Sequence, residues 1–166
     1  MIYIGLGANL DSPKYGPPLN TLMAALDVIN TCDCTVIRRS PWYKSASVPD
    51  PTLPWFVNGV AELNSMLAPD ELLARLHAVE DQFDRIRTVP NAPRTLDLDL
   101  LVYNDVVSTG SEKAIVPHPR MQDRAFVLLP LKDLAPDWID PRNGLTLKAL
   151  IDKLPDDQPC YPLAEA

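Results

Sequence analysis

The pattern of apolar and polar residues predicts short strands and one amphipathic helix in the first quarter of the chain. Residues 2–6 form a short apolar run that leads into a Gly-Ala-Asn sequence, which is typical of a strand that enters a turn. Residues 19–30 carry apolar side chains three or four positions apart, the spacing of one helix face. The β-branched residues at 35–39 favour a second strand, which residues 42–45 are expected to extend.

The middle of the chain predicts a strand, a helix and another strand in succession. Apolar and polar residues alternate over residues 56–63, as on a strand with two different faces. Pro69 stands at the first position of the next helix and is followed by two acidic residues that complement the helix dipole. Alternation returns over residues 95–103, and a hairpin is expected directly after it, at Asn104-Asp105.

These elements occur in the order β-α-β-β-α-β, which is the order of a ferredoxin-like sheet. The predicted fold class is therefore α+β, with an antiparallel or mixed sheet and helices packed against it. Apolar residues within 147–154 predict a last short helix, and the tail beyond Pro155 is expected to be loosely held. Because 166 residues is a usual size for one domain, residues 1–166 are expected to form a single domain.

Composition and charge exclude several classes of protein. The hydrophobic fraction of 46% and the charged fraction of 22% are those of an ordinary globular chain. No stretch reaches the ~20 apolar residues of a membrane span, and no secretory signal is visible, so a cytoplasmic protein is expected. A net charge of −7 argues against sequence-independent binding to nucleic acid. The cysteines, Cys32, Cys34 and Cys160, lack a second pair of zinc ligands and are expected to be reduced thiols.

The strongest chemical signal is the run R-T-L-D-L-D-L-L at residues 94–101. Because side chains two positions apart in a strand leave the same face, Asp97 and Asp99 are expected to project together, about 6.6 Å apart. The opposite, buried face is expected to carry Leu96, Leu98, Leu100 and Val102. Two carboxylates this close repel each other unless a cation lies near both, and Mg²⁺ combines one or two carboxylates with substrate phosphates. A solvated strand face with alternating acids is the open alternative.

Arginines around the acidic pair favour the binding of phosphate. Arg94 lies just ahead of the pair, and Arg85 and Arg87 lie upstream. A guanidinium group keeps its charge and binds phosphate oxygens in bidentate fashion, so carboxylates and arginines make the two halves of a phosphoryl-transfer site. The chain has no G-x-x-x-x-G-K-S/T phosphate loop, and Gly5 and Gly7 are expected to be turn glycines. ATP would then be held by side chains and magnesium.

Five further residues are open to both a structural and a functional interpretation. His118 lies between two prolines and near arginines, so a phosphate contact is expected, although a lone histidine is more often structural. His77 and Glu80 share one helix face and form either a nucleotide contact or a solvated helix edge. Phe56 and Asn58 suit a flat heterocycle, because an amide offers both donors and an acceptor beside the aromatic ring. A packed phenylalanine beside a capping asparagine is the alternative.

Five motifs follow one another along the chain. They are Gly5-Leu-Gly7-Ala-Asn9-Leu10, Phe56-Val-Asn58, Arg85-Ile-Arg87, Pro93-Arg94-Thr-Leu-Asp97-Leu-Asp99, and Val116-Pro-His118 with Arg124 and Phe126. Together they resemble the 6-hydroxymethyl-7,8-dihydropterin pyrophosphokinase family of folate biosynthesis, over residues 2–136. The R-x-x-D-x-D element is the most specific of them. The resemblance implies a three-layer α-β-α fold, transfer of the pyrophosphoryl unit of ATP to the pterin's hydroxymethyl oxygen, and release of AMP.

The resemblance also implies roles for individual residues. Asp97 and Asp99 match a pair that binds two magnesium ions, and Arg85 and Arg94 match arginines that contact the triphosphate or help the transfer. The residues on the ATP side are His77, Glu80, Arg87, Leu100, Lys113, Ile115, His118 and Arg124. The residues on the pterin side are Ser45, Val48, Phe56, Asn58 and Phe126. The expected partners are these two small molecules, with no nucleic acid or membrane, and a monomer is expected.

The sequence departs from the family pattern in its loops. Pro90 stands where a basic residue usually begins the signature, Pro119 replaces an aromatic residue, and Val48-Pro49 replaces a Leu-Gly pair. The loop at 88–93 is also one residue short and lacks a tryptophan. Two other functions stay open: a magnesium-dependent phosphotransferase or phosphatase with an unrelated acceptor, and a regulatory or binding module that has lost catalysis.

Overall fold

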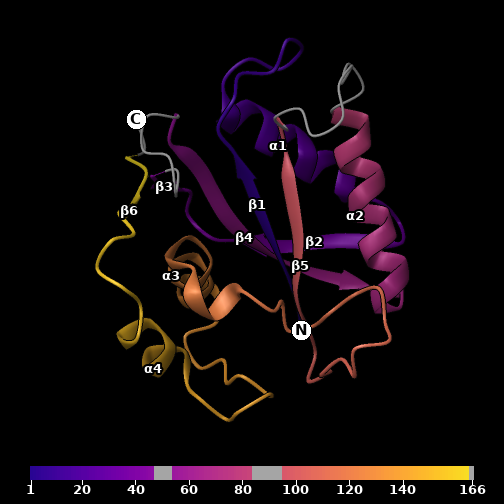
Figure 1. The fold of residues 1–166 in the computed structure, drawn as a ribbon. Coiled ribbons are helices and arrows are strands. Elements are labelled where there is room, and N and C mark those ends of the chain that lie inside the picture. Colours follow the sequence, from indigo (N-terminus) through magenta and orange to yellow (C-terminus); the bar gives the residue numbers. More distant parts are fainter. Residues whose placement is uncertain (47–53, 84–94, 165–166) are drawn as a thin grey trace.

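The computed structural model describes residues 1–46, 54–83 and 95–164, which form a sheet with helices on both faces (Figure 1). In chain order the elements are β1 (Ile2–Ala8), α1 (Pro18–Ile29), β2 (Cys34–Arg39), β3 (Tyr43–Ser45), β4 (Phe56–Ser65), α2 (Pro69–Phe83), β5 (Asp97–Tyr103), the 3-10 turn η1 (Met121–Asp123), α3 (Ala125–Leu134), α4 (Leu147–Asp152) and β6 (Cys160–Pro162). The predicted α+β class and the predicted order of the first elements are confirmed, except that residues 43–45 do not extend β2 but form the separate strand β3. No helix in the described ranges has the length and apolar character to cross a membrane.

The sheet has six strands in the order β5-β1-β4-β3-β6, and β2 also pairs with β4. Every strand pair among the described residues is antiparallel. β1 lies between β4 and β5, and its Gly7 is directly opposite Asn58 on one side and Asp97 on the other. Gly5 is opposite Val60 and Asp99 in the same way. Directly opposed residues have their side chains on the same face of the sheet. Asn58 and Val60 of β4 therefore share one face with Asp97 and Asp99 of β5.

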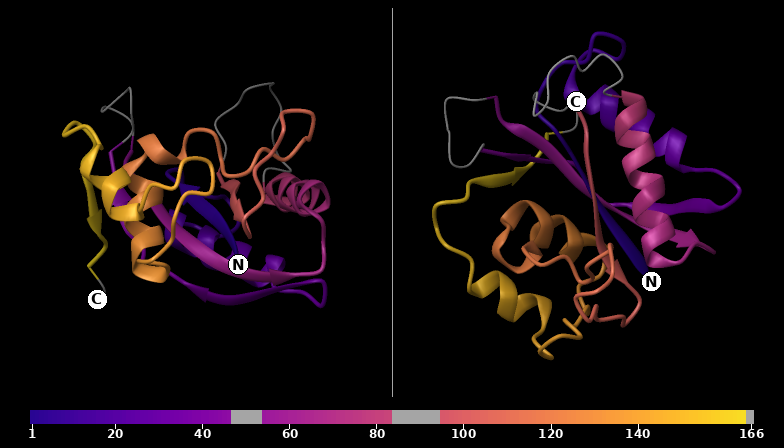
Figure 2. Two further views of the ribbon diagram at one scale, coloured as in Figure 1. Left: turned by 90° about the horizontal axis from the view of Figure 1, so that it is seen from below. Right: turned by 45° about the vertical axis from the view of Figure 1, so that its right-hand side comes forward.

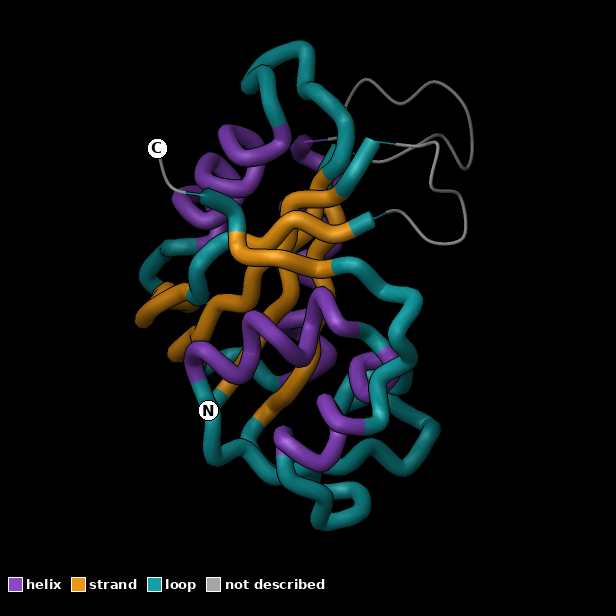
Figure 3. The backbone as a smooth tube through the Cα atoms, turned by 90° about the vertical axis from the view of Figure 1, so that its left-hand side faces the viewer, coloured by secondary structure: helices purple, strands orange, loops and turns teal. Residues whose placement is uncertain are grey.

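Each face of the sheet is covered by its own helices, so the three-layer α-β-α arrangement is confirmed (Figure 2). α1 and α2 pack on one face through residues such as Leu22, Leu72 and Leu76, which belong to the first core cluster. α3 and α4 pack on the other through residues such as Leu131 and Leu147, in the second cluster. Figure 3 follows the same helices and strands along the backbone.

A bulge near the end of β5 corrects one detail of the predicted alternation. Leu96, Leu98 and Leu100 lie in the first core cluster, as the pattern predicts, but Val102 lies in the second with Leu101. The register against β1 shifts at this point and leaves Leu101 without a partner of its own. An extra residue in one strand reverses the alternation beyond it, so the prediction for Val102 was wrong.

Three predictions about turns and the tail are also wrong. Asn104 does turn the chain, with φ of 50°. Among the described residues, however, β5 pairs with β1, and no strand after the turn pairs with β5 to form a hairpin. Gly5 and Gly7 are not turn glycines, because both lie inside β1. The tail beyond Pro155 is not loosely held, since β6 pairs with β3 and the N–H of Leu163 donates to the carbonyl of Trp42.

Helix α3 was not among the elements predicted from the sequence. Its sequence AFVLLPLKDL is apolar at most positions and contains Pro130, so no polar face and no helical period stand out. Tertiary contacts hold it against the sheet: Val127, Leu128 and Leu131 are buried in the second core cluster. The hydroxyl of Tyr43 on β3 donates to the Asp133 carboxylate on α3. Helix α3 begins directly after Arg124, which brings this arginine to the sheet.

Candidate active site

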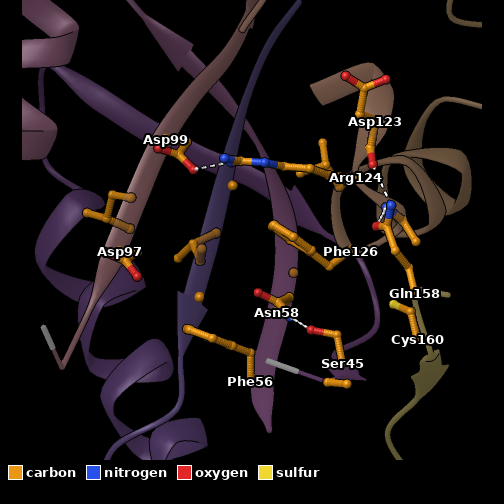
Figure 4. A pocket seen from close by; sticks show the side chains of 18 of the residues that line it. Ser45, Phe56, Asn58, Asp97, Asp99, Asp123, Arg124, Phe126, Gln158 and Cys160 are labelled. Carbon is orange, nitrogen blue, oxygen red and sulfur yellow. Dashed lines mark hydrogen bonds and ion pairs between the residues drawn. The ribbon is translucent and has the colours of Figure 1, made fainter. Parts of the chain in front are cut away.

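Asp97 and Asp99 leave β5 on the same face and line one cavity (Figure 4). Leu96, just before Asp97, and Leu98, between the two acids, are buried in the core on the opposite face. The strand itself produces this separation, since its side chains alternate between the two faces. On the neighbouring strand β1, the positions opposite the acids are glycines, which add no side chain in front of the carboxylates. The glycines therefore leave both acids on the wall of the cavity.

The cavity beside the acids has a volume of about 580 Å³, within the range of pockets that hold small molecules. It brings together residues that lie far apart in the sequence. Its lining includes Gly5, Gly7, Ser45, Phe56, Asn58, His77, Glu80, Asp97, Asp99, Arg124, Phe126, Gln158 and Cys160. Nine of the side chains selected from the sequence thus meet in one space: Ser45, Phe56, Asn58, His77, Glu80, Asp97, Asp99, Arg124 and Phe126.

Two basic side chains approach Asp99 without a hydrogen bond. Nη1 of Arg124 lies 3.9 Å from Oδ2 of Asp99, and Nε2 of His118 lies 3.9 Å from Oδ1. Asp99 is 41% exposed, and ion pairs of this length at a solvent-exposed site are weak. The Asp99 oxygens therefore keep most of their capacity to bind a cation. An anion that bound to such a cation would lie close to both basic groups.

His118 is held in one orientation by its own loop. Its backbone N–H donates to the Leu101 carbonyl over 2.8 Å, and its Nδ1 accepts from the backbone N–H of Arg120 over 3.1 Å. Burial lowers the pKa of His118, the charge of Asp99 raises it, and Arg124 with two other arginines lowers it, so that the net shift is downward. A neutral imidazole whose Nδ1 accepts carries its proton on Nε2. His118 thus presents an N–H donor toward Asp99.

The far end of the cavity combines an amide with aromatic rings. Nδ2 of Asn58 donates to Oγ of Ser45 over 2.6 Å, and both side chains are buried. Among the described residues, no other group bonds the second N–H or the oxygen of this amide. Phe56 and Phe126 line the same cavity, and in the view of Figure 4 the Asn58 amide lies between them. This end offers a flat, partly apolar space with a donor and an acceptor.

Gly7 makes room for the Asn58 amide. A Cβ atom at position 7 would lie 2.8 Å from Oδ1 of Asn58, which is closer than real contacts of this kind. Only a glycine fits at this point of β1 while Asn58 keeps its hydrogen bond to Ser45. The glycine thus contributes to the site by close approach of the backbone, not by a turn.

A smaller cavity of about 220 Å³ lies on the other side of Asp99. It is lined by further residues that the family resemblance assigns to ATP: His77, Leu100, Lys113, Ile115 and His118. Asp99, Leu98 and His77 line both cavities, so the two spaces adjoin at Asp99, whereas Asp97 lines only the larger cavity. The side chain of Leu100 is buried in the core, so a ligand there would contact its main chain.

Glu80 supports the acidic strand from helix α2. Its side chain is 5% exposed, and its Oε2 accepts from the backbone N–H of Leu98 over 2.9 Å. Leu98 lies between the two aspartates, on the last strand of the sheet, where its N–H faces no further strand among the described residues. The alternative of a solvated helix edge is therefore wrong for Glu80, whereas His77 is exposed.

Several residues at the site were not expected from the sequence. Gln158 and Cys160 line the main cavity from the tail, which was expected to be loose. Asp140, fully buried, pairs with Arg142 over 2.7 Å, and Nη1 of Arg142 donates to the His118 carbonyl over 3.3 Å. The Asp140–Arg142 pair is local, but no local pattern indicates the contact of Arg142 with His118 or the place of the tail at the cavity, because these join segments that meet only in the folded chain.

Some predicted residues cannot be placed. Arg85, Arg87, Arg94 and Val48 lie outside the described residues, as do Pro90 and the rest of the loop at 88–93. Within the part of the chain that the structure describes, no three histidine, cysteine, aspartate or glutamate side chains converge into a complete metal site. Asp97 and Asp99 instead form an open pair of oxygen donors, which suits a hard cation whose other ligands come from a substrate.

Comparison with known proteins agrees with this geometry. Residues 3–136 match the family model described as 7,8-dihydro-6-hydroxymethylpterin-pyrophosphokinase (HPPK). A 2-amino-4-hydroxy-6-hydroxymethyldihydropteridine pyrophosphokinase of Synechocystis sp. is 41% identical over 162 residues, which cover 97% of this chain and 79% of the relative. A protein of the same name from Pseudomonas aeruginosa is 42% identical over 155 residues, 93% of this chain and 91% of the relative. Folic acid synthesis protein fol1 of Pneumocystis carinii is 32% identical over 155 residues, but only 20% of its length is covered.

Proposed function

Because the chain belongs to the 7,8-dihydro-6-hydroxymethylpterin-pyrophosphokinase family, we propose that it transfers the pyrophosphoryl group of ATP to 6-hydroxymethyl-7,8-dihydropterin. The products are the pterin diphosphate and AMP, in the biosynthesis of folate. One observation carries the proposal: the two aspartates share a cavity with an amide and two aromatic rings, and Asp99 also lines a second cavity with basic side chains. An acceptor and a nucleotide can therefore meet above the acids.

Asp97 and Asp99 are the residues that would hold magnesium, and the resemblance to the family implies two ions. Their support is the shared face on β5 and the cavity that both carboxylates line. Magnesium bound there would offset the charge of the phosphates and lower the pKa of a hydroxyl group close to it. Glu80 keeps β5 in place between the two acids through the N–H of Leu98.

Arg124 and His118 are proposed to bind the phosphate oxygens. Both lie 3.9 Å from Asp99, so a phosphate that approaches this carboxylate with a bound cation comes within reach of both. The Arg124 guanidinium supplies a permanent charge, and the neutral His118 supplies an N–H donor. Arg85 and Arg94 are proposed to stabilise the transferring group, and Arg87 to contact ATP, on the basis of the sequence motifs alone. Lys113 and Ile115 line the smaller cavity and would contact the rest of the nucleotide.

The pterin is proposed to lie between Phe56 and Phe126, with its edge against Asn58. The second N–H and the oxygen of the Asn58 amide would pair with the acceptor and donor groups of the pterin ring. Ser45 fixes the amide by accepting its first N–H, so the orientation of Asn58 is set before the substrate binds. Val48 is proposed for the same pocket from the family motif.

The transfer is proposed as one in-line displacement. The pterin hydroxyl oxygen attacks the β-phosphorus, the bond from this phosphorus to the oxygen that bridges it to the α-phosphate breaks, and AMP leaves with that oxygen. The hydroxyl proton passes to Asp99. A covalent enzyme intermediate has no support among the described cavity residues: the Ser45 hydroxyl is bonded to Asn58, and burial raises the pKa of the Cys160 thiol to about 11. Neither side chain is an activated nucleophile.

We also infer that the enzyme works as a monomer in the cytosol. All three cysteines are free thiols, which suits a reducing compartment with a supply of ATP.

The direct test is to incubate the purified protein with ATP, magnesium chloride and 6-hydroxymethyl-7,8-dihydropterin, and to separate the nucleotides by chromatography. AMP is expected to form in amounts equal to the pterin diphosphate, and to be absent when the pterin is omitted or when magnesium is removed by chelation. Release of ADP would instead indicate a phosphotransferase with another mode of attack. Binding of ATP or pterin by calorimetry without any turnover would indicate a binding module.

A further inference from the structure

A glutamine in the C-terminal tail holds the peptide groups on both sides of Arg124. Nε2 of Gln158 donates to the backbone carbonyl of Asp123 over 2.7 Å, and Oε1 of Gln158 accepts from the backbone N–H of Ala125 over 2.9 Å. Figure 4 shows this side chain beside the segment that leads into α3. One amide therefore fixes the backbone directly before and directly after the arginine.

Arg124 begins α3 without a side-chain cap of its own. It is the N-cap residue, with an extended φ of −117° and ψ of 111°, and no side chain at this position caps the helix. The first N–H groups of a helix have no partner within it, and the Gln158 oxygen supplies one for Ala125 from 33 residues away. The Arg124 side chain instead extends into the cavity, 3.9 Å from Asp99 and 5.5 Å from the ring centroid of Phe126.

The tail that carries Gln158 is itself fixed at the pterin end of the cavity. β6 pairs with β3, so that Cys160 lies opposite Ser45, the residue that holds the Asn58 amide. Directly before it, the Pro159 carbonyl accepts from the N–H of Ala46 over 3.2 Å. Gln158 therefore stands on a segment anchored to the sheet, and its amide cannot follow Arg124 if the arginine moves.

We propose that Gln158 is a positioning residue for the transfer: by holding the peptide groups that flank Arg124, it sets the Arg124 guanidinium relative to Asp99. This inference rests on the proposed function, in which Arg124 binds the phosphates. Gln158 acts through the arginine and needs no contact with the reacting atoms. A residue that only anchors the tail would affect the stability of the protein and leave the turnover of the folded enzyme unchanged, so kinetics distinguish the two roles.

Three variants test the role of Gln158. Gln158→Leu removes both hydrogen bonds, whereas Gln158→Glu keeps an acceptor for Ala125 and places a carboxylate against the Asp123 carbonyl. Asp157→Asn is the matched control, since Asp157 is exposed and its side chain makes no hydrogen bond or ion pair in the described part of the chain. With two hydrogen bonds lost, kcat/KM is expected to fall by about ten- to a hundredfold in Gln158→Leu. The fall should be smaller in Gln158→Glu and absent in Asp157→Asn.

A double-mutant cycle with Arg124→Ala shows whether Gln158 acts through Arg124. Residues that act through each other have non-additive effects, so Gln158→Leu should change kcat/KM by less than about threefold once Arg124 is absent. Additive effects would overturn the positioning role, as would a lower melting temperature with unchanged kcat/KM. If Gln158→Leu does not fold, the cycle is run with Gln158→Glu. Wild-type AMP formation is measured in the same series. If the wild type forms no AMP, both the proposed function and this inference are overturned. If the wild type is active and the Gln158 variants have the same kcat/KM, only the inference is overturned.

Discussion

Replacement of Gly7 by alanine tests whether the backbone of β1 positions the Asn58 amide, which is proposed to pair with the pterin. A Cβ at this position would lie 2.8 Å from Oδ1 of Asn58. The amide has little freedom to retreat, because it is 4% exposed and its Nδ2 donates to Ser45 over 2.6 Å. The methyl group must therefore displace Asn58 and break the hydrogen bond to Ser45. Gly5, two positions earlier on the same face, is the matched control, since a Cβ there would meet only Leu101, at 3.5 Å.

The two substitutions should change stability in opposite directions. A buried amide and hydroxyl that lose each other cost about 1–3 kcal/mol, and alanine regains about 0.5–1 kcal/mol over glycine within a strand. Gly7→Ala should therefore lower the free energy of unfolding, by up to about 2.5 kcal/mol. Gly5→Ala should leave it unchanged or raise it by up to about 1 kcal/mol, because its methyl group makes an ordinary contact.

Urea unfolding measures the stability difference, and calorimetry with the dihydropterin and a non-hydrolysable ATP analogue measures the effect on the site. Because Gly7→Ala moves the amide that would pair with the pterin, its affinity for the pterin should fall by about tenfold or more. Gly5→Ala should bind the pterin as the wild type does. Equal pterin affinities in the two variants would refute the reasoning, since the close approach of Gly7 would then have no part in placing Asn58.

Three further predictions concern the supports of the site. Arg142→Leu leaves the buried Asp140 carboxylate unpaired and should lower the free energy of unfolding by about 2–4 kcal/mol at pH 7. Burial raises the pKa of the Asp140 carboxyl, but hydrogen bonds from Arg142 outweigh burial and lower this pKa below its ordinary value of 3.8. The stabilisation by the Asp140–Arg142 pair should therefore be lost as the pH falls below 3.8. The prediction is contradicted if urea unfolding shows the same loss of stability in Arg142→Leu at pH 7 and at pH 3. Glu80→Ala should cost about 1–3 kcal/mol in the same assay, because the N–H of Leu98 loses its acceptor, whereas Glu80→Gln keeps an acceptor and should cost less; the reverse order would be inconsistent with the contact. Since partial burial raises the pKa of Cys160 to about 11, iodoacetamide at pH 8 should label the exposed Cys32 before the half-buried Cys160, as followed by mass spectrometry. Equal labelling rates of the two thiols would speak against the raised pKa.

The parts of the fold that follow a local period could be predicted from the sequence. The alternation in β4 and β5 assigned Phe56 and Asn58, and Asp97 and Asp99, to their shared faces before any contact was known. Such patterns succeed because one buried face of a sheet dictates every second residue. The alternation failed only at Val102, where the bulge in β5 inserts a residue that no local pattern marks.

The remaining features depend on contacts between distant segments. Strand β6 has three residues and forms because β3 offers it an edge, which the sequence of the tail does not reveal. The sequence of α2 leaves Glu80 open between a nucleotide contact and a polar helix edge. Its hydrogen bond with the N–H of Leu98 depends on β5, which lies beside α2 only in the folded chain. Gly7 resembles a turn residue until the Asn58 side chain from β4 occupies the space that its missing Cβ leaves. The structural role of each of these groups follows only from a partner that is distant in the sequence.

The central claim is that Asp97 and Asp99 hold magnesium beneath the phosphates of ATP. The most direct test is the rate of AMP formation by Asp97→Asn and Asp99→Asn, each checked by circular dichroism, with Asp105→Asn on the exposed turn after β5 as the matched control. Loss of one metal-binding carboxylate should lower the rate by about a hundredfold or more, with the fold intact and the control unaffected. Turnover at the wild-type rate in either site variant would contradict the account.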